Sequence, residues 1–210
     1  MDLSTLTAWL REYARMIDEN AQHLTDLDAA IGDADHGINM QRGMSAVVAQ
    51  IDEAPPADMA GLCKQVGMTL VKSVGGASGP LYGTFFLRMA PALGTDDTVS
   101  ASDFAKALRA GVDGVVQRGR AEANDKTMFD ALAPALDALD AALEGDTDLP
   151  GALAAAATAA EKGRDATESM IARKGRASYL GQRSVGHIDP GATSAAMLIA
   201  AAATAAGSTS

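Results

Sequence analysis

Asp28-Ala-Ala-Ile-Gly-Asp33-Ala-Asp35-His-Gly-Ile-Asn39 is the stretch of sequence that determines the expected fold. On a continuous α-helix of about 3.6 residues per turn, Asp28 and Asp35 would lie almost in line, and Asp33 would lie well around the cylinder. The three carboxylates converge on one point only if the helix ends here. Gly32 and Gly37 tolerate the backbone angles that such a break requires. We therefore expect this stretch to end one helix and begin the next.

Asp28, Asp33 and Asp35 are candidate metal ligands. Converging carboxylates without cysteine suit Mg²⁺ or Ca²⁺, because these hard cations prefer oxygen ligands, whereas zinc and copper favour nitrogen and sulfur. The stretch lacks the later ligand positions and the closing glutamate of an EF-hand loop. From the spacing alone a second interpretation is equally open: a helix C-terminus followed by an acidic turn that only connects two helices.

The composition limits the classes of protein that fit. A chain of 210 residues is long enough for one well-cored domain or at most two small ones. Its net charge of −10 argues against nucleic acid and anionic membranes as partners. The single cysteine, Cys63, excludes an internal disulfide and a Cys-based zinc cluster. The N-terminus does not read as a signal peptide, and the apolar stretch Ala195–Ala206 is too short to span a bilayer. We expect a soluble, cytoplasmic protein.

Apolar residues recur at helical spacing along most of the chain, whereas strand-like alternation is scarce and aromatic residues make up only 4%. The pattern predicts eight helices, over Leu3–Leu27, Ile38–Ala54, Met59–Val74, Leu81–Leu93, Ser102–Arg118, Lys126–Leu143, Leu149–Ala172 and Gly191–Ala206. No repeat or linker-like segment interrupts them. We therefore predict an all-α fold with a single domain over residues 1–210.

The connections between these helices point to the site. Successive helices of an antiparallel bundle alternate in direction, so the loops after the first, third, fifth and seventh helices share one end. These loops contain Gly32–Gly37, Gly75–Pro80, Arg118–Thr127 and Arg173–Gly191, which include all the unusual clusters of residues. The loops at the other end have ordinary turn residues. The sequence therefore predicts ligand-binding loops at one end of the bundle.

Two of these loops suit phosphate. Ser73-Val-Gly-Gly-Ala-Ser-Gly-Pro80 leads into a helix, and a glycine-rich loop at a helix N-terminus presents free N–H groups and the positive end of the helix dipole. The alternative is a flexible turn with Ser78 as a helix cap. The cluster Arg173, Lys174 and Arg176 could neutralise phosphoryl oxygens, or could be a solvated loop. We favour Arg176, because a planar guanidinium binds phosphate in a bidentate manner and its small neighbours allow close approach.

Five ordered motifs carry a resemblance to a known family: Gly32-Asp-Ala-Asp-His-Gly37, Ser73-Val-Gly-Gly-Ala-Ser-Gly-Pro-Leu-Tyr-Gly-Thr-Phe-Phe86, Asp125-Lys-Thr-Met128, Ala172-Arg-Lys-Gly-Arg-Ala-Ser-Tyr-Leu-Gly181 and Gly186-His-Ile-Asp-Pro-Gly-Ala-Thr193. Over nearly its whole length the chain resembles the nucleotide-binding L subunits of phosphotransferase-system-dependent dihydroxyacetone kinases. The resemblance implies an eight-helix antiparallel barrel that holds ADP or ATP and Mg²⁺, expected as two ions, in the loops at one end.

The resemblance also implies a role for individual residues. Asp28, Asp33 and Asp35 match the metal ligands of the family. The positions that match its nucleotide contacts are His36, Ile38, Asn39, Ala77, Ser78, Gly119, Met128, Arg176, Asp189 and Gly191. Arg176 is also the expected catalytic residue, as a cation that faces the transferring phosphoryl group.

The function implied is phosphoryl transfer without a protein nucleophile. In the family, bound ADP accepts a phosphoryl group from a phosphohistidine on a separate carrier subunit, the M subunit. It then passes the group to dihydroxyacetone on a separate K subunit. Two alternatives stay open: the L domain of an ATP-dependent kinase for dihydroxyacetone or another short ketose, and a nucleotide-dependent regulatory binding module.

Overall fold

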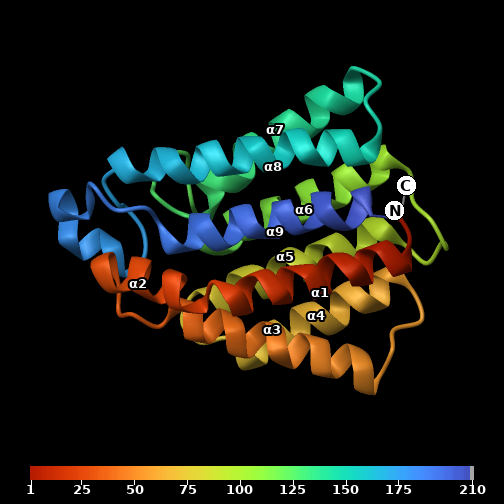
Figure 1. Cartoon of the computed structure of the whole chain (residues 1–210), viewed down its shortest axis with the longest axis horizontal. Coiled ribbons are helices and arrows are strands. Elements are labelled where there is room, and N and C mark those ends of the chain that lie inside the picture. Colours follow the sequence, from red (N-terminus) through yellow and green to blue (C-terminus); the bar gives the residue numbers. More distant parts are fainter. Residues whose placement is uncertain (209–210) are drawn as a thin grey trace.

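The computed structural model describes residues 1–208, and these residues form helices without a named β-strand (Figure 1). The α-helices are α1 (Leu3–Glu19), α2 (Ala21–Ile31), α3 (His36–Glu53), α4 (Met59–Ser73), α5 (Ser78–Leu93), α6 (Ala101–Gly119), α7 (Met128–Glu144), α8 (Leu149–Ala166) and α9 (Pro190–Gly207). Two 3₁₀ helices, η1 (Thr167–Ser169) and η2 (Arg176–Ser184), lie between α8 and α9.

The helices form a closed ring. From α3 to α9 each helix packs against the next one in the sequence, and α1 closes the ring by packing against both α3 and α9. In Figure 1 the helices run side by side, with α2 and the segment before α9 at one end and both termini at the other. The predicted all-α antiparallel barrel is therefore confirmed. That one domain spans residues 1–210 stays a prediction, and the last two positions lie outside the described residues.

The first predicted helix, Leu3–Leu27, consists of two helices. Asn20 separates α1 from α2, and its side-chain Nδ2 donates a hydrogen bond to the Met16 carbonyl at 2.8 Å. Such a side chain offers the backbone an alternative to the regular helical bonds, so it favours a helix end. The break matters for function because α2 also packs against α3, α9 and η2, and so carries Asp28 to the end of the barrel.

Aromatic residues from three helices form the centre of the core. The Trp9 ring lies 5.9 Å from the centroids of both Phe86 and Phe104, and all three side chains are fully buried. The Trp9 indole N–H donates to the carbonyl of Leu198 on α9 at 2.7 Å, so this large side chain has no unpaired polar atom. Removing such a side chain from a packed core typically costs about 3–5 kcal/mol of folding free energy.

Helix α9 is the one described helix with the length and composition to cross a membrane, and 67% of it is buried inside the fold. It is longer than the apolar stretch seen in the sequence, because Pro190 begins the helix and Asp189 caps it. Small alanine side chains let it pack closely against α1, α7 and α8. Its apolar character is therefore that of a core helix.

Candidate functional site

A cavity of about 610 Å³ opens at the end of the barrel where α2 lies. Its walls come from four parts of the chain: the α2–α3 loop, the start of α5, the α6–α7 loop, and the segment that runs from η1 through η2 to α9. These connections are the ones that the alternation of helix directions predicted to lie together. The prediction that they share one end is confirmed.

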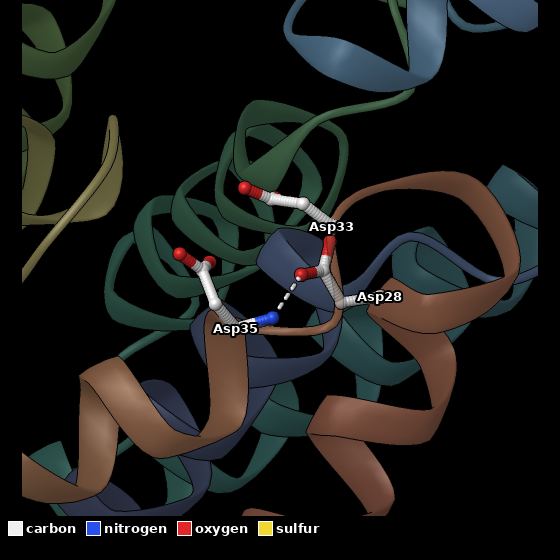
Figure 2. Close-up of side chains that lie close together, drawn as sticks. All are labelled: Asp28, Asp33 and Asp35. Carbon is white, nitrogen blue, oxygen red and sulfur yellow. Dashed lines mark hydrogen bonds between the residues drawn. The ribbon is translucent and has the colours of Figure 1, made fainter.

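Three carboxylates meet at the edge of this cavity. One oxygen each of Asp28, Asp33 and Asp35 lies within 4.8 Å of the other two (Figure 2). Asp28, at the end of α2, is buried, and its Oδ2 accepts hydrogen bonds from the backbone N–H groups of Asp35 at 2.8 Å and His36 at 3.1 Å. These bonds turn the chain back on itself between α2 and α3. The result is a set of hard oxygen donors that fits Mg²⁺.

Both glycines of this loop are required for space. Gly37 lies inside α3, so the prediction that it supplies an unusual backbone angle is wrong. Gly32 ends α2 with a φ of −135° and a ψ of −135°, outside the main allowed regions, so the prediction is confirmed for Gly32. A Cβ on Gly32 would lie 2.0 Å from Asp28 Oδ1, and a Cβ on Gly37 would lie 1.9 Å from the Ala21 carbonyl oxygen. The left-handed residue of the loop is Ala34, with a φ of 60°. The glycines thus let Asp28 fold against its own loop and let α3 approach α2.

The start of α5 forms a second wall and presents free backbone donors. Ala77 stands at the N-cap position of this helix without a side-chain cap, and Ser78 is the first helical residue. The alternative role for Ser78, as the cap of the helix, is therefore wrong. Gly76 has a φ of 64° and no atom within 4 Å of an added Cβ, so the loop is open toward the cavity. An uncapped helix N-terminus of this kind binds anions through its N–H groups and its dipole.

His36 joins the acidic loop to the start of α5. Its Nδ1 lies 3.1 Å from Ser78 Oγ and its Nε2 lies 2.9 Å from Ser194 Oγ, which in turn lies 2.7 Å from the Tyr82 hydroxyl. Burial lowers the pKa of His36, and the nearby carboxylates of Asp28 and Asp35 oppose the shift without cancelling it. A neutral imidazole between two hydroxyls orients Ser78 at the cavity wall.

The third and fourth walls come from the starts of α7 and α9. Asp189 caps α9 by accepting from the Ala192 N–H at 2.7 Å. Burial raises the pKa of Asp189 to about 7, against the hydrogen bond from Ala192 and the charge of Lys126. Met128, at the start of α7, is buried beside Gly191, where an added Cβ would lie 3.6 Å from the Met128 nitrogen.

Arg176 stands at the opening of the cavity, at the start of η2. Its side chain is 70% exposed, and its Nε lies 2.9 Å from Asp33 Oδ2. Lys174 also lines the cavity, whereas Arg173 contacts the α6–α7 loop through its backbone N–H. The structure thus brings two of the three predicted cations to the cavity, and one of them, Arg176, to the acidic loop.

Most of the predicted nucleotide contacts line the cavity: His36, Ala77, Ser78, Gly119, Met128, Arg176, Asp189 and Gly191. Two do not. The Ile38 side chain is 55% exposed on α3, and Asn39 accepts a hydrogen bond from Arg42 Nη2 at 2.7 Å. Whether the nucleotide reaches either residue stays a prediction.

Sequence reasoning gave no role to Lys126, which also lines the cavity. Its side chain is almost completely buried, with 1% exposed, and its ammonium donates hydrogen bonds to three backbone carbonyls. The sequence offered one signal: Lys126 lies where the loop Arg118–Thr127, with its unusual residues, meets the start of the predicted helix Lys126–Leu143. Its partners are 41 to 61 residues away in the sequence, so no local pattern identifies them.

The barrel and its cavity define a class of helical domain whose loops at one end offer oxygen ligands suited to a divalent cation and backbone donors suited to phosphate. The family model described as the DAK2 domain matches residues 30–204. The chain is 47% identical to the ADP-binding subunit DhaL of the PEP-dependent dihydroxyacetone kinase of Escherichia coli (strain K12), over 89% of each chain. It is 39% identical to the ADP-binding subunit DhaL of the PTS-dependent enzyme of Lactococcus lactis subsp. lactis, over 94% of this chain and 95% of that one.

Comparison with solved structures supports the same family through the similarity of the fold. The native dihydroxyacetone kinase of C. freundii aligns with a TM-score of 0.74 and 26% identity, over 95% of this chain and 34% of that enzyme. The same enzyme in complex with AMP-PNP and Mg²⁺ aligns with a TM-score of 0.72. The present chain thus spans about a third of the length of that kinase. The chain belongs to the DAK2 domain family, among the ADP-binding subunits of PEP-dependent dihydroxyacetone kinases.

Proposed function

We propose that this chain is the nucleotide-carrying subunit of a cytoplasmic, phosphoenolpyruvate-dependent dihydroxyacetone kinase. Its bound ADP accepts a phosphoryl group from a phosphohistidine carrier, the M subunit, and the group then passes to dihydroxyacetone on a separate K subunit. The observation that carries the proposal is the cavity itself. It joins three carboxylates, an uncapped helix N-terminus and an exposed arginine at one end of the barrel. The relatives that carry this name match the chain over most of its length.

Different residues of the cavity would bind different parts of the nucleotide and its metal. Asp28, Asp33 and Asp35 would hold Mg²⁺, which when bound neutralises phosphate charge and orients the phosphoryl oxygens. We expect two such ions, because the nucleotide phosphates carry more charge than one ion offsets. The N–H groups at the start of α5 would bind the phosphates, and the apolar wall that includes Leu81 and Met128 would suit the flat base.

Arg176 is the proposed catalytic residue. Phosphoryl transfer proceeds mainly by positioning and charge neutralisation, so a guanidinium that meets the transferring group stabilises the transition state. The side chain lies at the mouth of the cavity, where the carrier and acceptor subunits would approach. Cys63 does not suit a covalent step, because it is buried in the core and burial raises its pKa to about 12.

The experiment reconstitutes the transfer from purified parts. The chain, loaded with ADP and Mg²⁺, is mixed with a phosphohistidine carrier that was charged from labelled phosphoenolpyruvate. We expect label on the bound nucleotide first, and on dihydroxyacetone only after the K subunit is added. Repeated turnover of ATP and dihydroxyacetone by the chain alone would refute the proposal and favour an ATP-dependent kinase. Binding of ADP without any transfer would favour a regulatory module.

A further inference from the structure

Lys126 lies at the base of the segment that carries Arg176. We call residues 170–188, which connect η1 to α9, the Arg176 segment. The Lys126 ammonium donates to the Thr167 carbonyl at 2.6 Å, to the Met170 carbonyl at 3.3 Å and to the His187 carbonyl. Thr167 lies in η1 just before the segment, Met170 is the first residue of the segment, and His187 lies at its end. One buried cation therefore joins both ends of the Arg176 segment.

These bonds use the whole hydrogen-bonding capacity of the ammonium. A lysine has three N–H donors, and here each has a carbonyl partner. The side chain is almost completely buried, and its loss would leave those carbonyls without this partner in a place that water hardly reaches. Lys126 is thus committed to the protein backbone and has no remaining donor for a phosphate.

Asp125 adds a second link between the same two parts of the chain. Its backbone carbonyl accepts from the Arg173 N–H at 3.0 Å, and its Oδ2 lies 3.8 Å from Lys174 Nζ. Because Arg173 and Lys174 lie three and two residues before Arg176, the α6–α7 loop holds the Arg176 segment at its base and close to its functional residue.

The outer part of the Arg176 segment has limited support: η2 packs against α2, and the Ala172 N–H donates to Ser184 Oγ at 2.9 Å. Gly175, Gly181 and Gly186 all have a positive φ, and a Cβ added to any of them would have no atom within 4 Å. Tyr179 is 87% exposed. The ion pair of Arg176 with Asp33 is largely exposed, and such pairs contribute about 0–1 kcal/mol. The position of Arg176 therefore depends on how firmly the base is fixed, together with the packing of η2 against α2.

We propose that Lys126 is a positioning residue for phosphoryl transfer: by binding both ends of the Arg176 segment, it holds Arg176 over the cavity. The expected effect on transfer turnover rests on the proposed function, whereas the anchoring of the Arg176 segment depends on this chain alone. Met128 of the Asp125-Lys-Thr-Met128 motif is expected to contact the nucleotide. Through Lys126 the same motif has a second role, which is to hold the Arg176 segment.

The anchoring is tested by limited trypsin digestion of the nucleotide-loaded chain. The variant Lys126→Met matches the lysine side chain as far as Cε and removes the ammonium. The segment has four cleavage sites, at Arg173, Lys174, Arg176 and Arg183. We expect cleavage at these sites to accelerate at least about tenfold, while cleavage in α1 to α5 stays as in the wild type. The control is Lys106→Met, which removes an exposed lysine on α6 and should leave the digestion pattern of the segment unchanged.

The kinetic consequence is tested by a double-mutant cycle with Arg176→Gln. Lys126→Met should lower transfer turnover by up to about 100-fold, because small displacements of a positioned group have costs of this size, and should leave ADP retention within about twofold. In the Arg176→Gln background the same substitution should change turnover by less than about threefold, because coupled residues are not additive. A residue that only supports the fold would lower turnover equally in both backgrounds.

Several results would overturn the proposal. Equal losses in both backgrounds, digestion of the segment at the wild-type rate, or loss of bound ADP in Lys126→Met would each contradict it. If Lys126→Met does not unfold cooperatively, Lys126→Gln, which keeps two N–H donors, takes its place in both tests. If neither variant folds, Lys126 is a requirement of the whole fold and the proposal is wrong. Faster digestion in a chain whose wild type transfers no phosphate would support the anchor and refute the proposed function instead.

Discussion

Gly32→Ala is the substitution whose effect follows most directly from the structure. The new Cβ would lie 2.0 Å from Asp28 Oδ1 and 2.9 Å from Asp28 Cγ, whereas real Cβ contacts below 3.0 Å essentially do not occur. The carboxylate must therefore move by about 1 Å or rotate away. Either movement disturbs the two hydrogen bonds that Asp28 Oδ2 accepts from the backbone of the α2–α3 loop.

The expected size of the effect comes from those bonds. Hydrogen bonds to a charged group contribute about 1.5–3 kcal/mol each, so losing both should lower the free energy of unfolding by about 3 kcal/mol. Asp28 is also a proposed metal ligand, and disturbing the groups that orient a ligand typically weakens metal binding about 10- to 100-fold. Urea unfolding measures the first effect, and calorimetric titration of ADP with Mg²⁺ measures the second.

The control for this experiment is Gly207→Ala. It makes the same chemical change at the end of α9, where an added Cβ has no atom within 4 Å. We expect it to leave both quantities unchanged within about 0.5 kcal/mol, as surface substitutions usually do. If Gly32→Ala behaved like Gly207→Ala in both assays, the close packing of Asp28 against its own loop would not matter, and the argument for a preformed ligand set would fail.

Three further predictions concern charged residues of the site. Asp33→Asn and Asp35→Asn should abolish Mg²⁺-dependent ADP binding and leave the helical circular dichroism unchanged. The reason is that each substitution removes an exposed anionic ligand and no core contact. Wild-type ADP affinity in both variants would refute the metal assignment. Arg176→Lys keeps the charge but loses the planar fork, so transfer turnover should fall much more than ADP retention; a variant that simply loses its ADP would show a ground-state contact instead. Asp189 has a folded-state pKa of about 7 against 3.8 for the free group, so the folded chain binds the extra proton and its stability should fall as pH rises from about 4 to about 7. Urea unfolding of the metal-free chain should show that slope, and Asp189→Asn, which can still accept at the helix cap, should reduce it; an equal slope in the variant would place the titration elsewhere.

The sequence was sufficient for the architecture and for the end of the barrel where the site lies. Helical periodicity predicted the α-helices, and the alternation of their directions placed four distant loops together, because both depend on regular geometry. The break at Asn20 was missed because the apolar pattern continues through it from Leu10 to Leu24, and a single asparagine ends the helix through its side-chain bond to Met16.

The details of the site depend on contacts that no spacing reveals. The need for Gly32 arises from the position of the Asp28 carboxylate, and the need for Gly37 from the approach of α2 to α3. At Gly37 the local sequence therefore suggested an unusual backbone angle, whereas the structure requires only the absence of a side chain, because Gly37 lies inside α3. Lys126 was missed for a related reason, because a buried lysine is explained only by acceptors that the fold brings from far along the chain.

The closed ring has a practical consequence for attachment to other molecules. Helix α1 begins and α9 ends at the same end of the barrel, and the cavity opens at the other (Figure 1). With about 1.5 Å of rise per residue, the 17 residues of α1 place roughly 26 Å between that end and the break that leads to the site. A tag or a surface tether at either terminus would therefore leave the cavity facing solution. An extended linker would need at least about eight residues to bring a fused domain back to the cavity, so shorter fusions should deliver their cargo only to the site of another molecule.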